Sequence, residues 1–266
     1  MAQPAAGALY DRGSWSWRLN SKWFVLLGGA RAAIMQTADP SVAAGVAQFS
    51  SYRTDPLGRL ERTLDAVTTI GFGSPGRRAE VLADLRRIHS AVRGRTGTGA
   101  PYSALDPGLM FWVLATLVDT VLVVEQRYVG RLREHDRCRY YDESKVVAEA
   151  FGIPDRFVPE DLAAFRTYVA QRVATIRPDA ASAEITRSLL RPGLAWVPNA
   201  AFVPLDWITL ELLPTTLRRG LGLADLTPAQ LRVVRGAQAM SRVTLPRLPD
   251  ALATSPFTAR TLRRAA

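Results

Sequence analysis

Residues 109–124 read LMFWVLATLVDTVLVV, and only Thr116, Asp119 and Thr120 in this stretch are polar. A helix with apolar side chains on nearly every side has to be surrounded by other protein segments or by lipid. A helix that spans a bilayer needs about 20 apolar residues, and this run is shorter. The stretch therefore predicts a buried central helix, extending to about residue 127, in a protein without a membrane span.

The flanking sequence contains repeated signals for helix starts. In each signal a residue that can cap a helix stands directly before proline. Proline is tolerated at the first helical position and keeps its predecessor out of the helical conformation. Five such pairs are Asp39-Pro40, Asp55-Pro56, Ser74-Pro75, Asp106-Pro107 and Thr227-Pro228. The glycines expected near helix ends are Gly73, Gly94, Gly130 and Gly152.

Helical spacing of apolar residues predicts the remaining elements. Helices are expected near residues 22–37, 56–70, 77–94, 143–151, 159–175, 179–190, 203–220 and 227–240. No alternation of strands with helices, no strand ladder with hairpin turns and no internal repeat is evident, and the glycine-rich segment 94–99 is interpreted as a flexible connection. The sequence thus predicts an all-α fold: a single globular domain of about ten helices around the central apolar helix.

The domain is predicted to span residues 16–250. Residues 1–15 and 251–266 are polar or proline-rich, so we expect a loosely attached N-terminal segment and a C-terminal tail. The first residues lack the basic region and apolar core of a secretory signal, and a cytoplasmic protein is therefore expected.

Charge and cysteine content narrow the function classes. The formal net charge is +10, but the basic residues are scattered along the chain and do not alternate with aromatic residues. This pattern does not favour nucleic-acid binding. The single cysteine, Cys138, excludes an intramolecular disulfide and a multi-cysteine metal site. An exposed, unreactive thiol is favoured over a reactive one activated by Arg137 and Arg139.

Asp119 is the one charged residue inside the apolar run. A buried carboxylate needs a partner, and arginine is the natural one. We therefore expect a structural ion pair at Asp119, with acid–base catalysis as the alternative.

His89 is one of only two histidines in the chain. On a helix over 77–94, Arg86, His89 and Arg93 share one stripe, because they are three and seven residues apart. Val81, Leu85, Ile88 and Val92 form the expected apolar face of that helix, and His89 falls roughly 60° from its centre. The trio is interpreted either as a haem site, with the imidazole on iron and the arginines near the propionates, or as a basic surface stripe.

Further motifs decide between these interpretations. They are Arg59-x-x-Arg62-Thr63; Arg86-x-x-His89-x-x-x-Arg93-Gly94; Pro101-Tyr102-x-Ala104-x-Asp106-Pro107-x-Leu109-x-x-Trp112-Val113-x-Ala115-Thr116; Tyr140-Tyr141-x-Glu143; and Phe151-Gly152-Ile153-Pro154. Together, over roughly residues 25–220, they resemble the catalytic domain shared by bacterial latex clearing proteins, which are rubber oxygenases, and fungal MpaB-type oxygenases.

The resemblance implies an all-α fold that holds one haem b. His89 matches the axial ligand of the iron, and Arg86 and Arg93 match arginines around it. Arg62 and Thr63 match a basic residue and a threonine on the distal, catalytic side. The family often has lysine at the position of Arg62, and arginine does not give up its proton as lysine does. Leu114 stands where many members carry histidine.

The favoured hypothesis is a haem b-dependent oxygenase with dioxygen or peroxide as oxidant. An apolar pocket beside the central helix favours a hydrophobic small molecule, and oxidative tailoring of a secondary metabolite is the specific prediction. One alternative keeps the haem for dehydrogenation or a peroxidase-like oxidation. The other is a helical binding protein without enzymatic activity.

Overall fold

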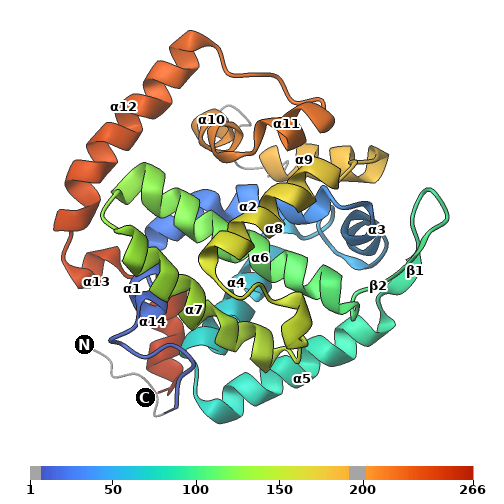
Figure 1. Cartoon of the computed structure of the whole chain (residues 1–266), viewed down its shortest axis with the longest axis horizontal. Helices are drawn as coiled ribbons and strands as arrows, with labels where there is room; N and C mark the ends of the chain where they lie inside the picture. The colour runs from blue at the N-terminus through green and yellow to red at the C-terminus, as the bar shows by residue number, and fades with distance from the viewer. Residues whose placement is uncertain (1–6, 192–201, 266) are drawn as a thin grey trace.

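The apolar run forms α6 (Pro107–Val124), in the middle of the molecule (Figure 1). Trp112, Ala115 and Thr116 on this helix have no exposed area. The helix packs against α2 (Gly29–Thr37), α7 (Glu134–Ala150) and α8 (Leu162–Thr175). Pro107–Val129 is long and apolar enough to cross a membrane by length and composition, yet half of its most apolar window is buried inside the protein. The predicted central helix is thus confirmed.

The computed structural model describes residues 7–191 and 202–265, and within them the fold is all-α, as predicted. The other helices are α1 (Trp15–Asn20), α3 (Pro40–Phe49), α4 (Pro56–Phe72), α5 (Pro75–Ala91), α9 (Ala180–Leu190), α10 (Val203–Leu212), α11 (Thr215–Gly220), α12 (Pro228–Thr244), α13 (Asp250–Ala253) and α14 (Pro256–Ala265). Short 3-10 or π-helical turns cover η1 (Trp23–Gly28), η2 (Glu125–Val129), η3 (Asp155–Phe157) and η5 (Leu245–Arg247).

All five capping signals start a helix. The side chains of Asp39, Asp55 and Asp106 each accept a hydrogen bond from a backbone N–H in the first turn. Thr227 forms a reciprocal capping box with Gln230. Ser74 precedes α5 in an extended conformation without a capping bond from its side chain.

Asp106→Ala tests the start of the central helix. Asp106 Oδ1 accepts a hydrogen bond of 2.9 Å from the Leu109 N–H. Loss of this cap should lower the free energy of unfolding by about 1 kcal/mol, as measured by urea denaturation. Ser74→Ala removes a cap residue that makes no such bond and should cost less. Equal losses in the two variants would contradict the assigned role of Asp106.

Several expected helices have different bounds in the structure, and two of them show the physical reasons. The helix expected over 203–220 is divided into α10 and α11, because Leu213 is extended ahead of Pro214 and proline disfavours a helical predecessor. The helix expected over 143–151 begins earlier, at Glu134.

The expectation of no hairpin was wrong. Antiparallel strands β1 (Arg93–Arg95) and β2 (Pro101–Ser103) follow α5, and Gly94 pairs with Tyr102. Segment 94–99 is therefore not a flexible connection: it supplies part of β1 and the turn, in which Gly99 has a φ of +84°. A Cβ on Gly94 would lie 3.0 Å from Gln48 Oε1, so a side chain there would crowd the hairpin.

The described parts of both chain ends are attached to the body of the protein, contrary to expectation. Tyr10 stacks edge-on against Phe72, with ring centroids 5.4 Å apart. Helix α14 packs on α4, where Thr261 hydrogen-bonds Thr68 over 3.0 Å. Long-range contacts of this kind leave no local pattern in the sequence. The division at residues 15 and 250 stays a prediction, and residues 1–6 and 266 lie outside the described ranges.

Candidate functional site

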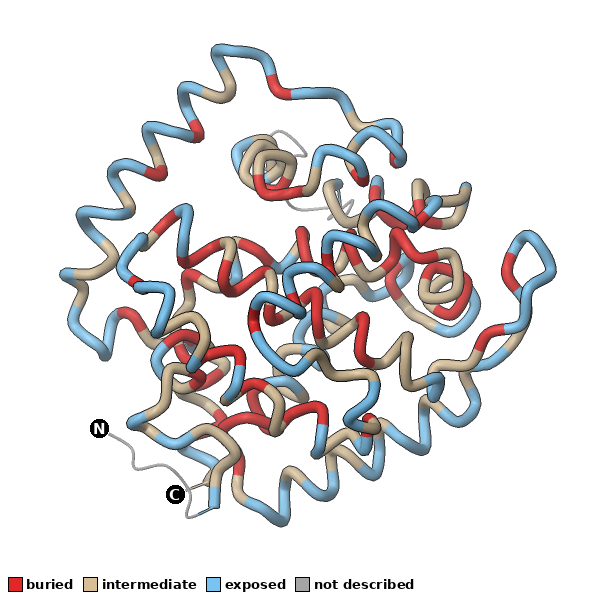
Figure 2. Tube along the Cα trace, viewed as in Figure 1, coloured by how far each residue is buried: buried red, intermediate tan, exposed pale blue. Residues whose placement is uncertain are grey.

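Helix α5 lies along one edge of the molecule and has no buried residue (Figures 1 and 2). Leu82, Leu85 and His89 are half-buried and share its inner side, because they are three and four residues apart. Ile88, expected in the apolar face, is 50% exposed. The covered side of α5 is therefore rotated toward His89, and the expected apolar face was partly wrong.

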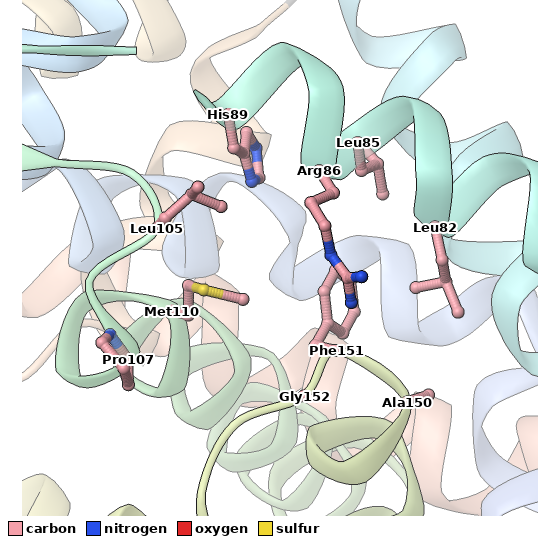
Figure 3. A pocket seen from close by; sticks show the side chains of 10 residues that line it. All are labelled: Leu82, Leu85, Arg86, His89, Leu105, Pro107, Met110, Ala150, Phe151 and Gly152. Atoms are coloured by element: carbon pink, nitrogen blue, oxygen red, sulfur yellow. The ribbon is translucent and has the colours of Figure 1, made fainter. Parts of the chain in front are cut away.

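A cavity of about 240 Å³ lies beneath this side of α5. Its walls come from α5, from the segment that leads into α6 and from the end of α7. The lining residues are Leu82, Leu85, Arg86, His89, Leu105, Pro107, Met110, Ala150, Phe151 and Gly152. Figure 3 shows His89 and Arg86 pointing from α5 into the space above Met110 and Phe151. The cavity thus combines one imidazole and one guanidinium with an otherwise apolar lining.

Burial lowers the pKa of His89 below its usual 6.5, because desolvation penalises the charged imidazolium. The imidazole forms no hydrogen bond with any group in the described ranges. A neutral imidazole with a free nitrogen is the form that binds a metal ion. The lowered pKa and the absence of a hydrogen-bond partner thus both favour a neutral ring with a free nitrogen at His89.

The pKa of His89 can be measured directly in the purified protein without added ligand. An NMR titration of the imidazole resonances, assigned with His89→Ala, should give a midpoint below 6.5. The physical reason is that folding removes water from the ring, so the folded state binds a proton less readily than the unfolded chain. A midpoint above 6.5 would contradict the partly desolvated position of the ring.

Arg86 is exposed at the rim of the cavity, and no carboxylate within the described ranges forms an ion pair with it. Its Nη2 lies 3.7 Å from the point where a Cβ on Gly152 would stand. Gly152 has a φ of +71°, which favours glycine, and its lack of a side chain leaves room for the guanidinium. Arg86 is thus available to an anionic group at the edge of the cavity.

Arg93 does not join this pair. Helix α5 ends at Ala91, and Arg93 is an exposed residue of β1 that does not line the cavity. The expectation that Arg86, His89 and Arg93 share one helical stripe was therefore wrong at its last member.

Arg62 and Thr63 lie on the exposed N-terminal half of α4 and do not line the cavity either. Arg62 forms an ion pair with Asp55, 3.0 Å from Nη1 to Oδ2, and donates a second hydrogen bond to Ser51 Oγ. The Thr63 hydroxyl donates to the Arg59 carbonyl one turn earlier, over 2.9 Å. Both side chains are thus bound to their own surroundings, and their distal, catalytic role stays a prediction.

Three further residues singled out in the sequence lie on α6 and α7. Asp119 forms an ion pair with Arg31, 2.6 Å from Oδ2 to Nη2, as predicted. Leu114 packs partly buried against the hydrophobic core and does not line the cavity. Cys138 is half-buried against the same core, so the expectation of an exposed thiol was wrong.

The cavity also contains residues to which the sequence assigned no role. Leu105, Met110 and Phe151 form much of its apolar lining. All three lie in or next to motifs that carry the family resemblance. Proximity to those motifs was the available signal, but helical periodicity alone does not reveal that residues 105–110 and 150–152 meet.

No group of three or more His, Cys, Asp or Glu side chains in the described ranges is placed to hold a metal ion. Haem requires only one ligand from the protein. A single histidine such as His89 would therefore provide enough protein ligands for a haem.

Comparison with known proteins supports the resemblance over most of the chain. Residues 17–243 match the family described as ER-bound oxygenase mpaB/B'/Rubber oxygenase, catalytic domain. Two uncharacterized proteins, Mb2261 of Mycobacterium bovis and Rv2237 of Mycobacterium tuberculosis, are each 25% identical over 179 residues. That alignment covers 66% of this chain and 67% of each relative. No solved structure matches the chain significantly.

Proposed function

The chain belongs to the family of mpaB and rubber oxygenase catalytic domains, and from this premise we propose that it is a haem b-dependent oxygenase in which His89 would bind the iron. Membership makes it an oxidoreductase with an oxygenase-type catalytic domain that acts on a small molecule and oxygen. The observation that carries the haem proposal is the position of His89, whose imidazole enters an apolar cavity.

The residues that line the cavity fit a haem in their chemistry. The neutral imidazole supplies a nitrogen for the iron, and leucine, methionine and phenylalanine side chains suit the faces of a porphyrin. Arg86 supplies a cation at the rim, where a propionate needs one. A cavity of about 240 Å³ is smaller than most ligand pockets, so a haem would extend beyond it.

Each residue has a separate task in this proposal. His89 would hold the iron, which would supply the oxidative chemistry when haem is bound. Arg86 would hold a propionate, and Phe151 and Met110 would exclude water from the space around His89. Arg93 is proposed as a second propionate partner from β1. Its exposed position requires the propionate to reach out of the cavity.

Arg62 and Thr63 are proposed as distal groups that donate hydrogen bonds to the oxidant. Arg62 would first have to exchange Asp55 and Ser51 for the new partner. Because its guanidinium stays charged at all relevant pH values, it acts as a fixed hydrogen-bond donor and not as a proton donor. This is the chemical difference that arginine brings at a position where lysine is common.

The apolar lining favours a hydrophobic substrate. We propose oxidative tailoring of a secondary metabolite in the cytoplasm as the physiological role.

Absorbance of the purified protein tests the cofactor. Protein produced with haem supply, or mixed with haemin, should show a Soret band at one haem per chain. A colourless protein that takes up no haemin would overturn the proposal. Once a substrate is found, labelled dioxygen separates oxygen insertion, which labels the product, from dehydrogenation or a peroxidase-like oxidation, which does not.

A further inference from the structure

Helix α12 (Pro228–Thr244) crosses the outside of the molecule with one side against the body and the other facing outward (Figures 1 and 2). Its inner side contacts α10 and η2. Val234 and Gln238 are buried there, and the Ser241 hydroxyl donates to the Tyr128 carbonyl over 2.9 Å. These contacts fix which side of the helix faces away from the protein.

The outward side is apolar. Val233, Met240 and Val243 are 58%, 66% and 54% exposed. At about 100° per residue they fall within about 80° of one another, opposite the buried Val234 and Gln238. Gly236 lies between them, and a Cβ placed on it would meet no atom within 4 Å. An amphipathic helix of a soluble protein normally points such a stripe inward, so this stripe requires an occupant.

Arginine side chains lie beside the apolar stripe, and no carboxylate on the same helix compensates their charge. Residues 228–247 contain four arginines and no Asp or Glu. Arg232 and Arg235 are exposed and form no ion pair within the described ranges, and the stretches outside those ranges contain no Asp or Glu. The nearest carboxylates along the chain, Asp225 and Asp250, are paired with Arg218 and Lys22. The occupant therefore has to be both apolar and anionic.

We propose that the outward face of α12 binds the surface of a bilayer that contains anionic lipids. A helix with an apolar stripe and flanking arginines lies in the plane of such a surface, with its apolar side chains among the acyl chains and its arginines at the headgroups. The protein then lies on the membrane and does not span it. This inference concerns a surface separate from the His89 cavity and is independent of haem.

A second copy of the chain fits the surface less well. Two α12 helices packed together would bring two arginine-bearing, acid-free segments within one Debye length. The face is also small. Seventeen residues give a helix about 25 Å long and about 10 Å wide, or about 250 Å², against about 800 Å² per partner in a stable protein interface.

Vesicle flotation with the full chain tests the proposal. The protein should float with vesicles of equal parts phosphatidylcholine and phosphatidylglycerol, and not with phosphatidylcholine alone. Raising the salt from about 0.1 M to about 1 M shortens the Debye length from about 10 to about 3 Å and should reduce the bound fraction. Failure to bind the anionic vesicles would overturn the proposal.

Matched variants separate the α12 face from general surface charge. Arg232→Gln with Arg235→Gln should weaken vesicle binding about 20- to 30-fold, since each arginine contributes about fivefold at an anionic surface. Arg177→Gln with Arg187→Gln removes the same charge from exposed positions elsewhere and should change binding less than twofold. Equal losses in the two double variants would show a non-specific attraction and contradict the assignment.

The apolar stripe needs its own readout. Val233→Ser with Met240→Ser should reduce vesicle binding at least tenfold, whereas Phe49→Ser, at a position 51% exposed on α3, should not. Circular dichroism and the Tm of each variant check that the fold is intact. A probe on Met240→Cys in a Cys138→Ser background should show a blue shift on vesicle binding. Absence of this shift, or a concentration-dependent dimer that the α12 variants abolish, would overturn the proposal.

Discussion

Asp119→Ala is expected to lower the free energy of unfolding by about 3–5 kcal/mol. Its carboxylate is the ionic partner of Arg31, whose side chain is only 3% exposed. The Arg31 guanidinium also donates to Thr120 Oγ1 and to the Leu212 carbonyl, 2.8 Å from Nε. It therefore cannot turn out to solvent when the carboxylate is removed, and a buried charge is left without compensation. Urea denaturation measures the loss.

A charge-free pair provides the control for this prediction. Arg31→Met with Asp119→Leu removes both charges together and should cost less than Asp119→Ala alone, since well-packed apolar side chains often replace a buried ion pair at little cost. The exposed partner of Arg264 gives a second comparison: Asp65→Ala should change stability by less than about 1 kcal/mol. A loss of similar size in Asp65→Ala and Asp119→Ala would contradict the claim that burial makes the Asp119 pair important.

His89→Ala is expected to weaken haem binding by more than about 100-fold, because loss of an outer-shell partner alone costs a metal site about 10- to 100-fold. The substitution removes the nitrogen proposed to bind the iron and leaves the apolar lining in place. Haem titration followed at the Soret band gives the dissociation constant. Since His89 is only partly buried, the variant should keep its fold, as circular dichroism will verify.

The chain offers a matched control in its second histidine. The His135 side chain is 78% exposed and lies on α7, outside the cavity. His135→Ala should therefore bind haem with the affinity of the unaltered protein. If His135→Ala loses haem and His89→Ala retains it, the assignment of the ligand is wrong.

Local chemistry explains which parts of the fold were predictable. The Asp-Pro, Ser-Pro and Thr-Pro pairs each place a cap next to a residue with a fixed φ, so every one of them starts a helix. Residues 109–124 are apolar on nearly all sides, and the run is too short to span a bilayer, so a central position was predictable. The break before Pro214 was not predicted, although the sequence contained the signal for it, because proline disfavours a helical conformation of the residue before it.

Tertiary contacts determined the features that the sequence did not reveal, namely which side of α5 is covered and where Arg93 lies. On α5, the large apolar residues between Val81 and Ile88 spread around about a third of the helix, and periodicity cannot tell which part of that arc is covered. The start of α6 and the Phe151–Gly152 turn cover the side with His89. The spacing of Arg93 fitted a helical stripe, but the chain leaves the helix after Ala91 to form the hairpin.

The family motifs located the imidazole, but not its distance from the proposed distal groups. Arg62 and Thr63 were grouped with His89 by resemblance, and the structure holds them on α4 in bonds to Asp55 and to their own helix. Their part in the reaction depends on a rearrangement that no sequence pattern reveals.

Chemical rescue of His89→Gly tests the central claim most directly. The variant leaves a space in the cavity where the ring stood, and free imidazole should enter it. We expect His89→Gly to lose the Soret spectrum of the unaltered protein and to regain it when imidazole is added, while His135→Gly, outside the cavity, should need no rescue. A His89→Gly protein that binds haem with an unchanged spectrum in the absence of imidazole would contradict His89 as the axial ligand.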